Sequence, residues 1–405
     1  YQIEHIHVNG TDASYNGGSG IVLDASQDGV FSLNAQYLTI ANSTFDHNTK
    51  DGGEFLSTGS FGPGGFGDTY ENIQIQSSDF SHNGADGLEF RAIASGRQGR
   101  AEQHVTLLGI TADTNTSDGV NVYASATDGV YIAGIPCTTV QGAAGGCAFV
   151  RQNVVLEYSD ISNNNGNGVF VVTDANNYGA IYGMSGRPHN PTLELFATTV
   201  DHNSDGGLDV SNHVTGNSYL YQYNAAVDST FDHNGSDSIY SSSYAAGGST
   251  ILQRSLLYSY HATASASYNG GNGFKAVTEA LGGSYVRDIN IVEGANLNQN
   301  GSFGFDGAIS YADGTSTALQ INAVYFNTIN SNGDGIGLYS IGPGAQQITY
   351  IGGNHIQSNA FVGAYGEANF GAFQYIDIYA LGNTVNSNGT DYLFNAFGGA
   401  TQILH

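Results

Sequence analysis

The sequence predicts an all-β fold, a single-stranded parallel β-helix of about twelve coils, because one short phrase recurs at a nearly fixed spacing. The phrase is an apolar residue, two spacers, an Asn, and a small polar turn that ends in Gly before a new apolar strand. A clean copy runs from Phe80 to Phe90. Neighbouring copies are 27 to 49 residues apart, which is typical of solenoids. The repeat asparagines are Asn16, Asn48, Asn83, Asn115, Asn164, Asn203, Asn234, Asn269, Asn300, Asn332, Asn359 and Asn388.

Each copy also shows the alternation of a β-strand. Leu88 and Phe90, like Val120 and Val122, are two residues apart, so their side chains point to one face. No convincing helical pattern separates the strands, which argues against βαβ units. The Asn suits a corner because its amide can donate to one neighbouring coil and accept from the other. We also expect this Asn to adopt the left-handed conformation, and the Gly four residues later to provide a second positive φ.

The composition is that of an ordered, acidic chain. Of 405 residues, 58 are Gly and 5 are Pro, while 40% are hydrophobic. The repeat runs from end to end, which predicts one domain, 1–405, with enlarged loops at about 135–148 and 173–191. No apolar stretch reaches the roughly 18 residues of a membrane span. The missing signal peptide and starting Met indicate a mature fragment or an excised piece.

The net charge and the two cysteines indicate the cellular compartment of the protein and the partners that suit it. There are 9 Lys and Arg against 35 Asp and Glu, a formal net charge of −26. Such a field repels nucleic acid and polyanions and attracts divalent cations. Cys137 and Cys147 are close in sequence, which predicts a disulfide closing a surface loop in an oxidising compartment. We therefore expect an extracellular or cell-surface protein.

The repeat phrase, apolar-x-x-Asn-x-x-(Asp/Asn/Ser)-Gly-apolar-x-apolar, resembles the right-handed parallel β-helix repeat of the pectin-lyase-like superfamily. The resemblance covers essentially all 405 residues and implies a right-handed β-helix. That superfamily includes pectate and alginate lyases, C5-epimerases, phage tailspikes, autotransporter passengers and large adhesins, so the fold alone does not decide the function. In character the repeats are closest to bacterial surface and adhesin segments.

A histidine precedes the repeat Asn in four coils, following Asp or Ser. His beside Asp is the usual general-base pair, yet an active site is normally built once. Repetition at one coil position favours stacked, solvent-facing imidazoles, with metal binding and catalysis as the alternatives. The triplets begin at Asp46, Ser81, Asp201 and Asp232.

A second recurring pattern is acidic. Asp51, Asp86 and Asp118 each follow a repeat Asn by three residues, so consecutive coils bring them toward a common column. Solvated turns are the simpler interpretation. A Ca²⁺ ion that bridges their oxygens is the alternative, because Ca²⁺ accepts irregular oxygen cages.

The two widest spacings, 49 and 39 residues, are adjacent and hold the enlarged loops. Irregular insertions on one stretch of a solenoid commonly mark its functional face. The β-helix lyases that this fold resembles use an Arg or Lys base, with Ca²⁺ neutralising a uronate carboxylate, but no lyase or epimerase motif matches residue by residue. A decorated loop is the simpler interpretation. The catalytic candidates of the alternative are Arg91, Arg97, Arg100, His104, Arg187 and His189.

Three tyrosines, Tyr219, Tyr221 and Tyr223, alternate and therefore share one face of a strand. If that face is outside, the rings form an aromatic platform for sugar rings. If it is inside, they are core residues, and Leu220 and Gln222 face solvent. The core interpretation is favoured, and sugar binding by the tyrosines is the alternative.

The two ends of the chain match one another. From Asn388 to Asn16 of a following copy would be 33 residues, inside the normal spacing, which predicts copies stacked end to end. We expect a structural or adhesive segment of a bacterial surface fibre, stiffened by Ca²⁺. Its partners would be its own copies and a surface glycan, without nucleic acid or membrane insertion. The alternative is a carbohydrate-active enzyme, a polysaccharide lyase or C5-epimerase acting on acidic polysaccharide.

Overall fold

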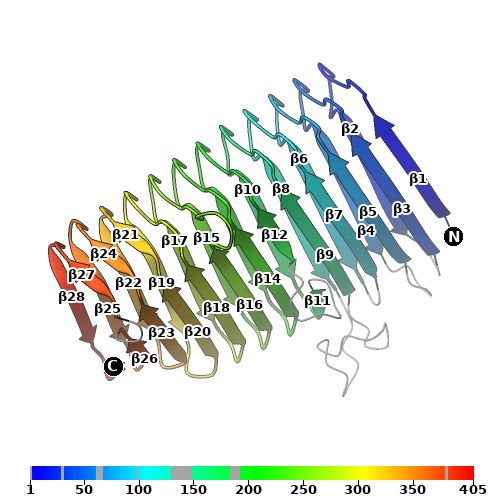
Figure 1. Ribbon diagram of the computed structural model, residues 1–405. Helices are drawn as coiled ribbons and strands as arrows, with labels where there is room; N and C mark the ends of the chain where they lie inside the picture. Colours follow the sequence, from blue (N-terminus) through cyan, green and yellow to red (C-terminus); the bar gives the residue numbers. More distant parts are fainter. Residues whose placement is uncertain are drawn as a thin grey trace. The chain divides into compact units, whose positions relative to one another are not determined.

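The computed structural model describes residues 2–28, 32–60, 67–96, 99–128, 148–182, 192–378 and 382–405. These ranges contain no helix, and their strands form a parallel β-solenoid of about 11 turns (Figure 1). The predicted parallel β-helix of about twelve coils is therefore confirmed, while its right-handedness stays a prediction. Nothing in the described ranges is a helix of the length and apolarity that crossing a membrane requires.

The chain forms two compact units. Unit 1 comprises Tyr1–Thr199 and Asn212–Tyr223, and unit 2 comprises Val200–Ser211 and Asn224–His405. Of the enlarged loops expected at 135–148 and 173–191, the first lies outside the described residues up to 147, and the second is described only over 173–182. The described part of the second loop contains the end of one strand and a further short strand.

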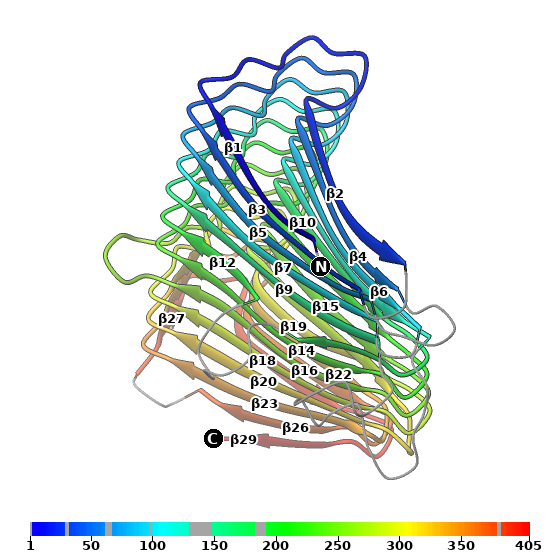
Figure 2. The ribbon, with the colours of Figure 1, turned by 90° about the vertical axis from the view of Figure 1, so that its right-hand side faces the viewer.

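Unit 1 contains two parallel sheets whose strands alternate along the chain, and Figure 2 shows the strands of the first sheet side by side. The first sheet holds β1 (Gln2–Asn9), β3 (Ser32–Ala41), β5 (Gly67–Gln76), β7 (Arg100–Leu108), β9 (Ala148–Glu157), β11 (Gly179–Tyr182), β12 (Leu193–Phe196) and the start of β14 (Tyr219–Val227). The second sheet holds β2 (Ile21–Asp28), β4 (Gly53–Ser60), β6 (Leu88–Ser95), β8 (Val120–Thr127), β10 (Val169–Ala175) and the end of β13 (Leu208–Val214).

Unit 2 repeats the two sheets and adds a small third one. Its first sheet holds the end of β14, β16 (Thr250–Tyr258), β18 (Tyr285–Glu293), β20 (Thr317–Tyr325), β23 (Ala345–Gly352), β26 (Phe373–Asp377) and β29 (Thr401–Leu404). Its second sheet holds the start of β13, β15 (Ile239–Ala245), β17 (Phe274–Ala280), β19 (Phe303–Ala312), β22 (Asp334–Ile341), β25 (Val362–Asn369) and β28 (Thr390–Ala396). The third sheet holds β21 (Thr328–Asn330), β24 (His355–Gln357) and β27 (Thr384–Asn386).

Parallel pairing in register places like residues over like residues. Phe55 of β4 faces Phe90 of β6, and their rings are stacked with centroids 5.0 Å apart. Phe274 and Phe305 form the same contact in unit 2. Along β4 and β6 buried residues alternate with half-buried ones, so each strand has one interior and one outer face. The strand alternation in the sequence therefore builds a continuous core within each unit.

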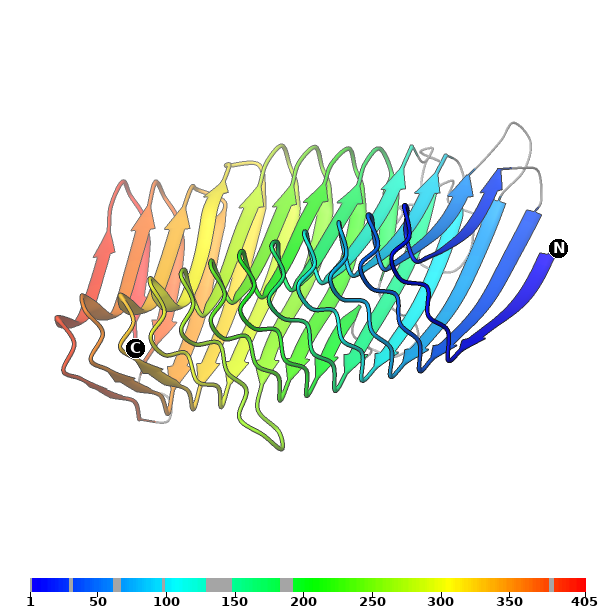
Figure 3. The same ribbon diagram turned by 90° about the horizontal axis from the view of Figure 1, so that it is seen from above.

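The corners of consecutive coils lie in rows within each unit (Figure 3). The left-handed residue is the one before the repeat Asn, such as His47 with φ 54° and His82 with φ 58°. The expectation that Asn itself adopts this conformation is wrong. The expected positive φ at the later Gly is also wrong, since Gly52 lacks it. Glycine is needed there because a Cβ on Gly52 would lie 2.6 Å from the carbonyl oxygen of Gly87 in the next coil.

Candidate functional site

The repeat asparagines form a hydrogen-bonded ladder in each unit. In unit 1, Oδ1 of Asn48 accepts hydrogen bonds from the backbone N–H and the side-chain amide of Asn16, at 3.0 and 2.9 Å. Oδ1 of Asn83 accepts the same two bonds from Asn48. In unit 2, Oδ1 of Asn300 accepts both bonds from Asn269. The prediction that these amides form hydrogen bonds between neighbouring coils is confirmed. The repeat asparagines therefore stabilise the scaffold.

The carboxylates of Asp51, Asp86 and Asp118, which we call the acidic column, also form hydrogen bonds between coils. Oδ1 of Asp51 accepts the backbone N–H of Asp86 at 3.0 Å, and Oδ1 of Asp86 accepts that of Asp118 at 3.0 Å. All three carboxylates are buried. Burial raises the pKa of Asp51, while the hydrogen bond from Asp86 opposes the change. In the described ranges no group of three or more His, Cys, Asp or Glu side chains is arranged to hold a metal ion. The bond to the next coil accounts for one oxygen of each carboxylate.

An interior ladder of glutamines, which the repeat phrase does not predict, also links the coils. Nε2 of Gln103 donates to Oε2 of Glu71 at 2.8 Å, and Nε2 of Gln152 donates to Oε1 of Gln103 at 2.8 Å. A signal existed, because these residues stand twelve positions before a repeat Asn. We call the aligned interior residues the glutamine ladder: in unit 1 Gln36, Glu71, Gln103 and Gln152, and in unit 2 Gln253, Asp288, Gln320, Gln347, Gln374 and Gln402.

Oppositely charged side chains lie close together on the outer face of the first sheet in unit 1, in an arrangement that does not recur from coil to coil. We call Arg100, Glu102, His104 and Arg151 the Glu102 cluster. Glu102 is hydrogen-bonded to the Arg100 guanidinium, and its carboxylate lies 3.1 Å from Nη1 of Arg151 and 4.0 Å from Nε2 of His104. Burial alone would raise the pKa of Glu102, but the bonds from His104 and Arg100 and the charges of both arginines lower it to about 2. Glu102 is therefore a permanent anion between two cations.

Aromatic rings adjoin this cluster. The guanidinium groups of Arg100 and Arg151 lie 5.6 and 5.7 Å from the ring centroid of Phe149. The Phe149 ring is in turn 5.5 Å from that of Tyr182, which lies 5.1 Å from that of Tyr219. One side of the outer face thus carries charges, and the other carries rings.

Tyr219, Tyr221 and Tyr223 lie on that outer face. Leu220 and Gln222, between them, are 0% and 1% exposed and fill the interior. The tyrosines are half-buried, so the favoured core interpretation is wrong. In the interior, Nε2 of Gln222 donates to Oγ1 of Thr173 at 3.5 Å, and its Oε1 has no protein partner. The sugar-binding role of the three rings stays a prediction.

The catalytic candidates are only partly brought together. Arg100 and His104 belong to the Glu102 cluster, whose members Glu102 and Arg151 were not among the candidates. Arg91 is on the second sheet, with Nε 3.9 Å from Oε1 of Glu89. Outside the described residues are Arg97, Arg187 and His189, and also the predicted disulfide partners Cys137 and Cys147.

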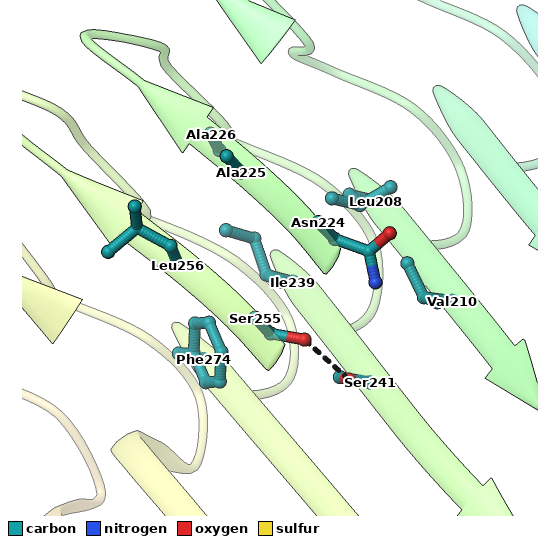
Figure 4. Close-up of a pocket in the computed structure, with 10 residues that line it drawn as sticks. All are labelled: Leu208, Val210, Asn224, Ala225, Ala226, Ile239, Ser241, Ser255, Leu256 and Phe274. Carbon is teal, nitrogen blue, oxygen red and sulfur yellow. Dashed lines mark hydrogen bonds between the residues drawn. The ribbon is translucent and has the colours of Figure 1, made fainter. Parts of the chain in front are cut away.

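A small cavity lies inside unit 2, between the two sheets (Figure 4). It has room for about one water molecule, far too little for a sugar. Asn224 borders it, and neither atom of its buried amide has a protein partner. Ser241 and Ser255, also at the cavity, are hydrogen-bonded to each other at 3.0 Å. The cavity suits one ordered water and is not a substrate site.

Comparisons with protein-family models, with curated proteins and with solved structures give no match. The resemblance to the pectin-lyase-like superfamily therefore rests on the repeat phrase alone. Function has to be argued from the side chains themselves.

Proposed function

We propose that the chain is a structural and adhesive β-helix segment of an extracellular bacterial fibre or large repeat protein, and that it binds a surface glycan on the outer face of unit 1. One observation carries this proposal. The recurring asparagines and the Asp51 column are engaged with the next coil, whereas the Glu102 cluster brings two arginines, a carboxylate and a histidine together beside aromatic rings. The repeats thus serve the scaffold, and the Glu102 cluster is left for recognition.

The chemistry of this face suits a sugar. Rings such as Tyr219 and Tyr221 offer apolar faces to the C–H face of a pyranose, while arginines and a carboxylate can hydrogen-bond its hydroxyls. The formal charge of −26 disfavours polyanions, so a neutral glycan is the better ligand.

Assembly into a fibre is proposed because the repeat spacing is kept between copies: from Asn388 to Asn16 of a following copy would be 33 residues, inside the normal spacing. Ca²⁺ at the Asp51, Asp86 and Asp118 column would stiffen the fibre, because the nearby carboxylates of Glu54 and Glu89 add to the negative charge there.

Glycan binding is tested with immobilised polysaccharides, neutral and acidic, and two triple variants. Replacement of Tyr219, Tyr221 and Tyr223 by Ala should weaken binding of a neutral glycan more than about tenfold. The matched control replaces Tyr325, Tyr350 and Tyr375, three outward tyrosines on the first sheet of unit 2, and should leave binding unchanged. Equal loss in both variants, or no binding by the unaltered chain, would remove the adhesive part of the proposal.

A second candidate is a polysaccharide lyase or C5-epimerase, and the Glu102 cluster favours it because an arginine base and a His lie on one face. Incubation with alginate and with pectate, in the presence of Ca²⁺, tests it. A lyase gives ultraviolet-absorbing unsaturated product, and an epimerase changes the polymer's NMR spectrum. Turnover that disappears with Arg151→Ala would replace adhesion by catalysis as the function.

A further inference from the structure

Stacked rings line the exposed corner of consecutive coils in unit 1. Tyr15, His47 and His82 each stand before a repeat Asn, with a left-handed backbone and an exposed side chain. The ring centroids of Tyr15 and His47 are 4.7 Å apart, and those of His47 and His82 are 4.8 Å apart. The two imidazole planes differ by 3°. Two imidazoles therefore stand side by side toward solvent, on backbone that hydrogen bonds between coils hold in place.

Unit 2 contains the same arrangement. The ring centroids of His202 and His233 are 4.7 Å apart, and their planes differ by 5°. Tyr268 covers the other face of His233 at 4.9 Å. All three positions again have a positive φ, and all three side chains are exposed. In each unit a tyrosine thus ends a stack that contains one histidine pair.

A carboxylate orients one imidazole of the first pair. Nδ1 of His47 lies 3.1 Å from Oδ2 of Asp46. An imidazole that donates its Nδ1–H to a carboxylate presents Nε2 as a free ligand, which is the usual outer-shell arrangement of metal-binding histidines. Ring stacking by itself does not call for this contact.

We propose that the pairs His47–His82 and His202–His233 are two binding sites for a divalent transition-metal ion such as Zn²⁺. Each ion would be held by one ring nitrogen from each of two adjacent coils, with water completing its coordination. Imidazole is a good ligand for Zn²⁺, Cu²⁺ and Ni²⁺, whereas Ca²⁺ selects oxygen. The formal charge of −26 raises the concentration of dications near the chain. This ion and these residues differ from the Ca²⁺ proposed at the acidic column.

The imidazoles have to rotate to close on an ion. Zn–N bonds of about 2.0–2.1 Å in a tetrahedral site place two ligand nitrogens about 3.4 Å apart, with the ion in the plane of both rings. The planes of His47 and His82 are nearly parallel and their centroids are 4.8 Å apart, so binding has to break the stack and turn both rings toward a shared point. Both side chains are exposed, which leaves room for this rotation. With two protein ligands, binding should be weaker than at a structural zinc site with four.

Calorimetric titration of the whole chain with Zn²⁺ at neutral pH tests the proposal. We expect two ions per chain, one after His82→Asn, one after His233→Asn, and none after both changes. Asn is the suitable replacement because Asn163 already occupies the equivalent corner position with φ 58°. The coil should therefore keep its conformation, and circular dichroism of each variant verifies this.

The control is His355→Ala, which removes a single exposed histidine that stacks on no other described imidazole, and should leave two ions bound. Three results would overturn the inference: no Zn²⁺ bound by the unaltered chain, two ions still bound by the doubly substituted chain, or displacement of Zn²⁺ by an equal concentration of Ca²⁺. The last result would assign the ions to carboxylates. Loss of one ion in each single variant supports the paired sites.

Discussion

At the scale of single residues, a buried carboxyl makes the glutamine ladder of unit 1 sensitive to pH. Burial raises the pKa of Glu71 to about 8, although a hydrogen bond from Gln103 acts in the opposite direction. Oε1 of Glu71 has no partner, and neither has Oε1 of Gln36 in the facing position. A protonated Glu71 satisfies both atoms, because its O–H can donate to the Gln36 oxygen. An ionised Glu71 would leave two acceptors facing each other.

We expect stability to fall as the pH rises. Below the ordinary pKa of 4.5 both folded and unfolded chains carry the proton on Glu71. Between that pH and about 8 only the folded chain keeps it, so stability falls by up to about 1.4 kcal/mol per pH unit. Glu71→Gln completes the ladder without a titrating group and should make this slope less steep. Glu89, Asp288 and Asp306, whose pKa values are raised to about 7, account for the slope that stays. Urea unfolding across the pH range measures it, with Glu279→Gln on an outer face as the control.

The Asn ladder predicts a second effect. Asn83→Ala removes the acceptor of the Asn48 backbone N–H and side-chain amide, and also the donor to Asn115. Because these groups are buried, we expect a loss of about 2–4 kcal/mol in the free energy of unfolding. Asn16→Ala, in the exposed first coil, should cost clearly less in the same urea titration. Similar losses at both positions would contradict the burial argument.

At the scale of one element, the corner turn depends on close approach of neighbouring coils. A Cβ on Gly52 would lie 2.6 Å from the carbonyl oxygen of Gly87 and 2.8 Å from Nδ2 of Asn83. Both contacts are too short to be relieved without separating two coils. We expect Gly52→Ala to cost more than about 3 kcal/mol, or to prevent folding. Thermal unfolding by circular dichroism measures it.

Gly17 provides the matched control at a corner. An added Cβ there meets nothing within 4 Å, and its φ is not positive. Gly17→Ala should therefore be neutral or stabilising by about 0.5 kcal/mol, through the less flexible unfolded chain. Destabilisation by Gly17→Ala as large as that by Gly52→Ala would mean that backbone conformation, and not contact, decides these glycines.

The strands and corners could be predicted from sequence because their signals are local. Alternation such as Leu88 with Phe90 and a recurring Asn need only one coil to be recognised. The side of Tyr221 could not be decided from the sequence, because a tyrosine is stable on either face and the burial of a polar residue such as Gln222 is not expected. The pairing of Glu102 with Arg151 depends on register between strands far apart in sequence. Spacing to the repeat Asn could have revealed that register, since it places whole coils over one another.

At the scale of whole coils, a solenoid is stabilised mainly by contacts between neighbours. Within unit 2, excision of one complete coil should therefore be tolerated. Deletion of residues 270–300 joins Asn269 to Gly301 and removes β17 and β18, one strand from each sheet. Phe305 then takes the place of Phe274 beneath Ile239, because the three are aligned in register.

The same deletion also improves the interior polar column. Gln320 takes the place of Asp288, whose burial raises its pKa to about 7. We expect the shortened chain to fold with an unchanged β-sheet circular dichroism spectrum per residue, and to lose less stability on raising the pH. Deletion of residues 270–284 is the control. It removes β17 but leaves β18, so the strands of the two sheets no longer alternate along the chain. Folding of the control as well as the full-coil deletion, or of neither, would show that contact between matched neighbouring coils is not what stabilises unit 2.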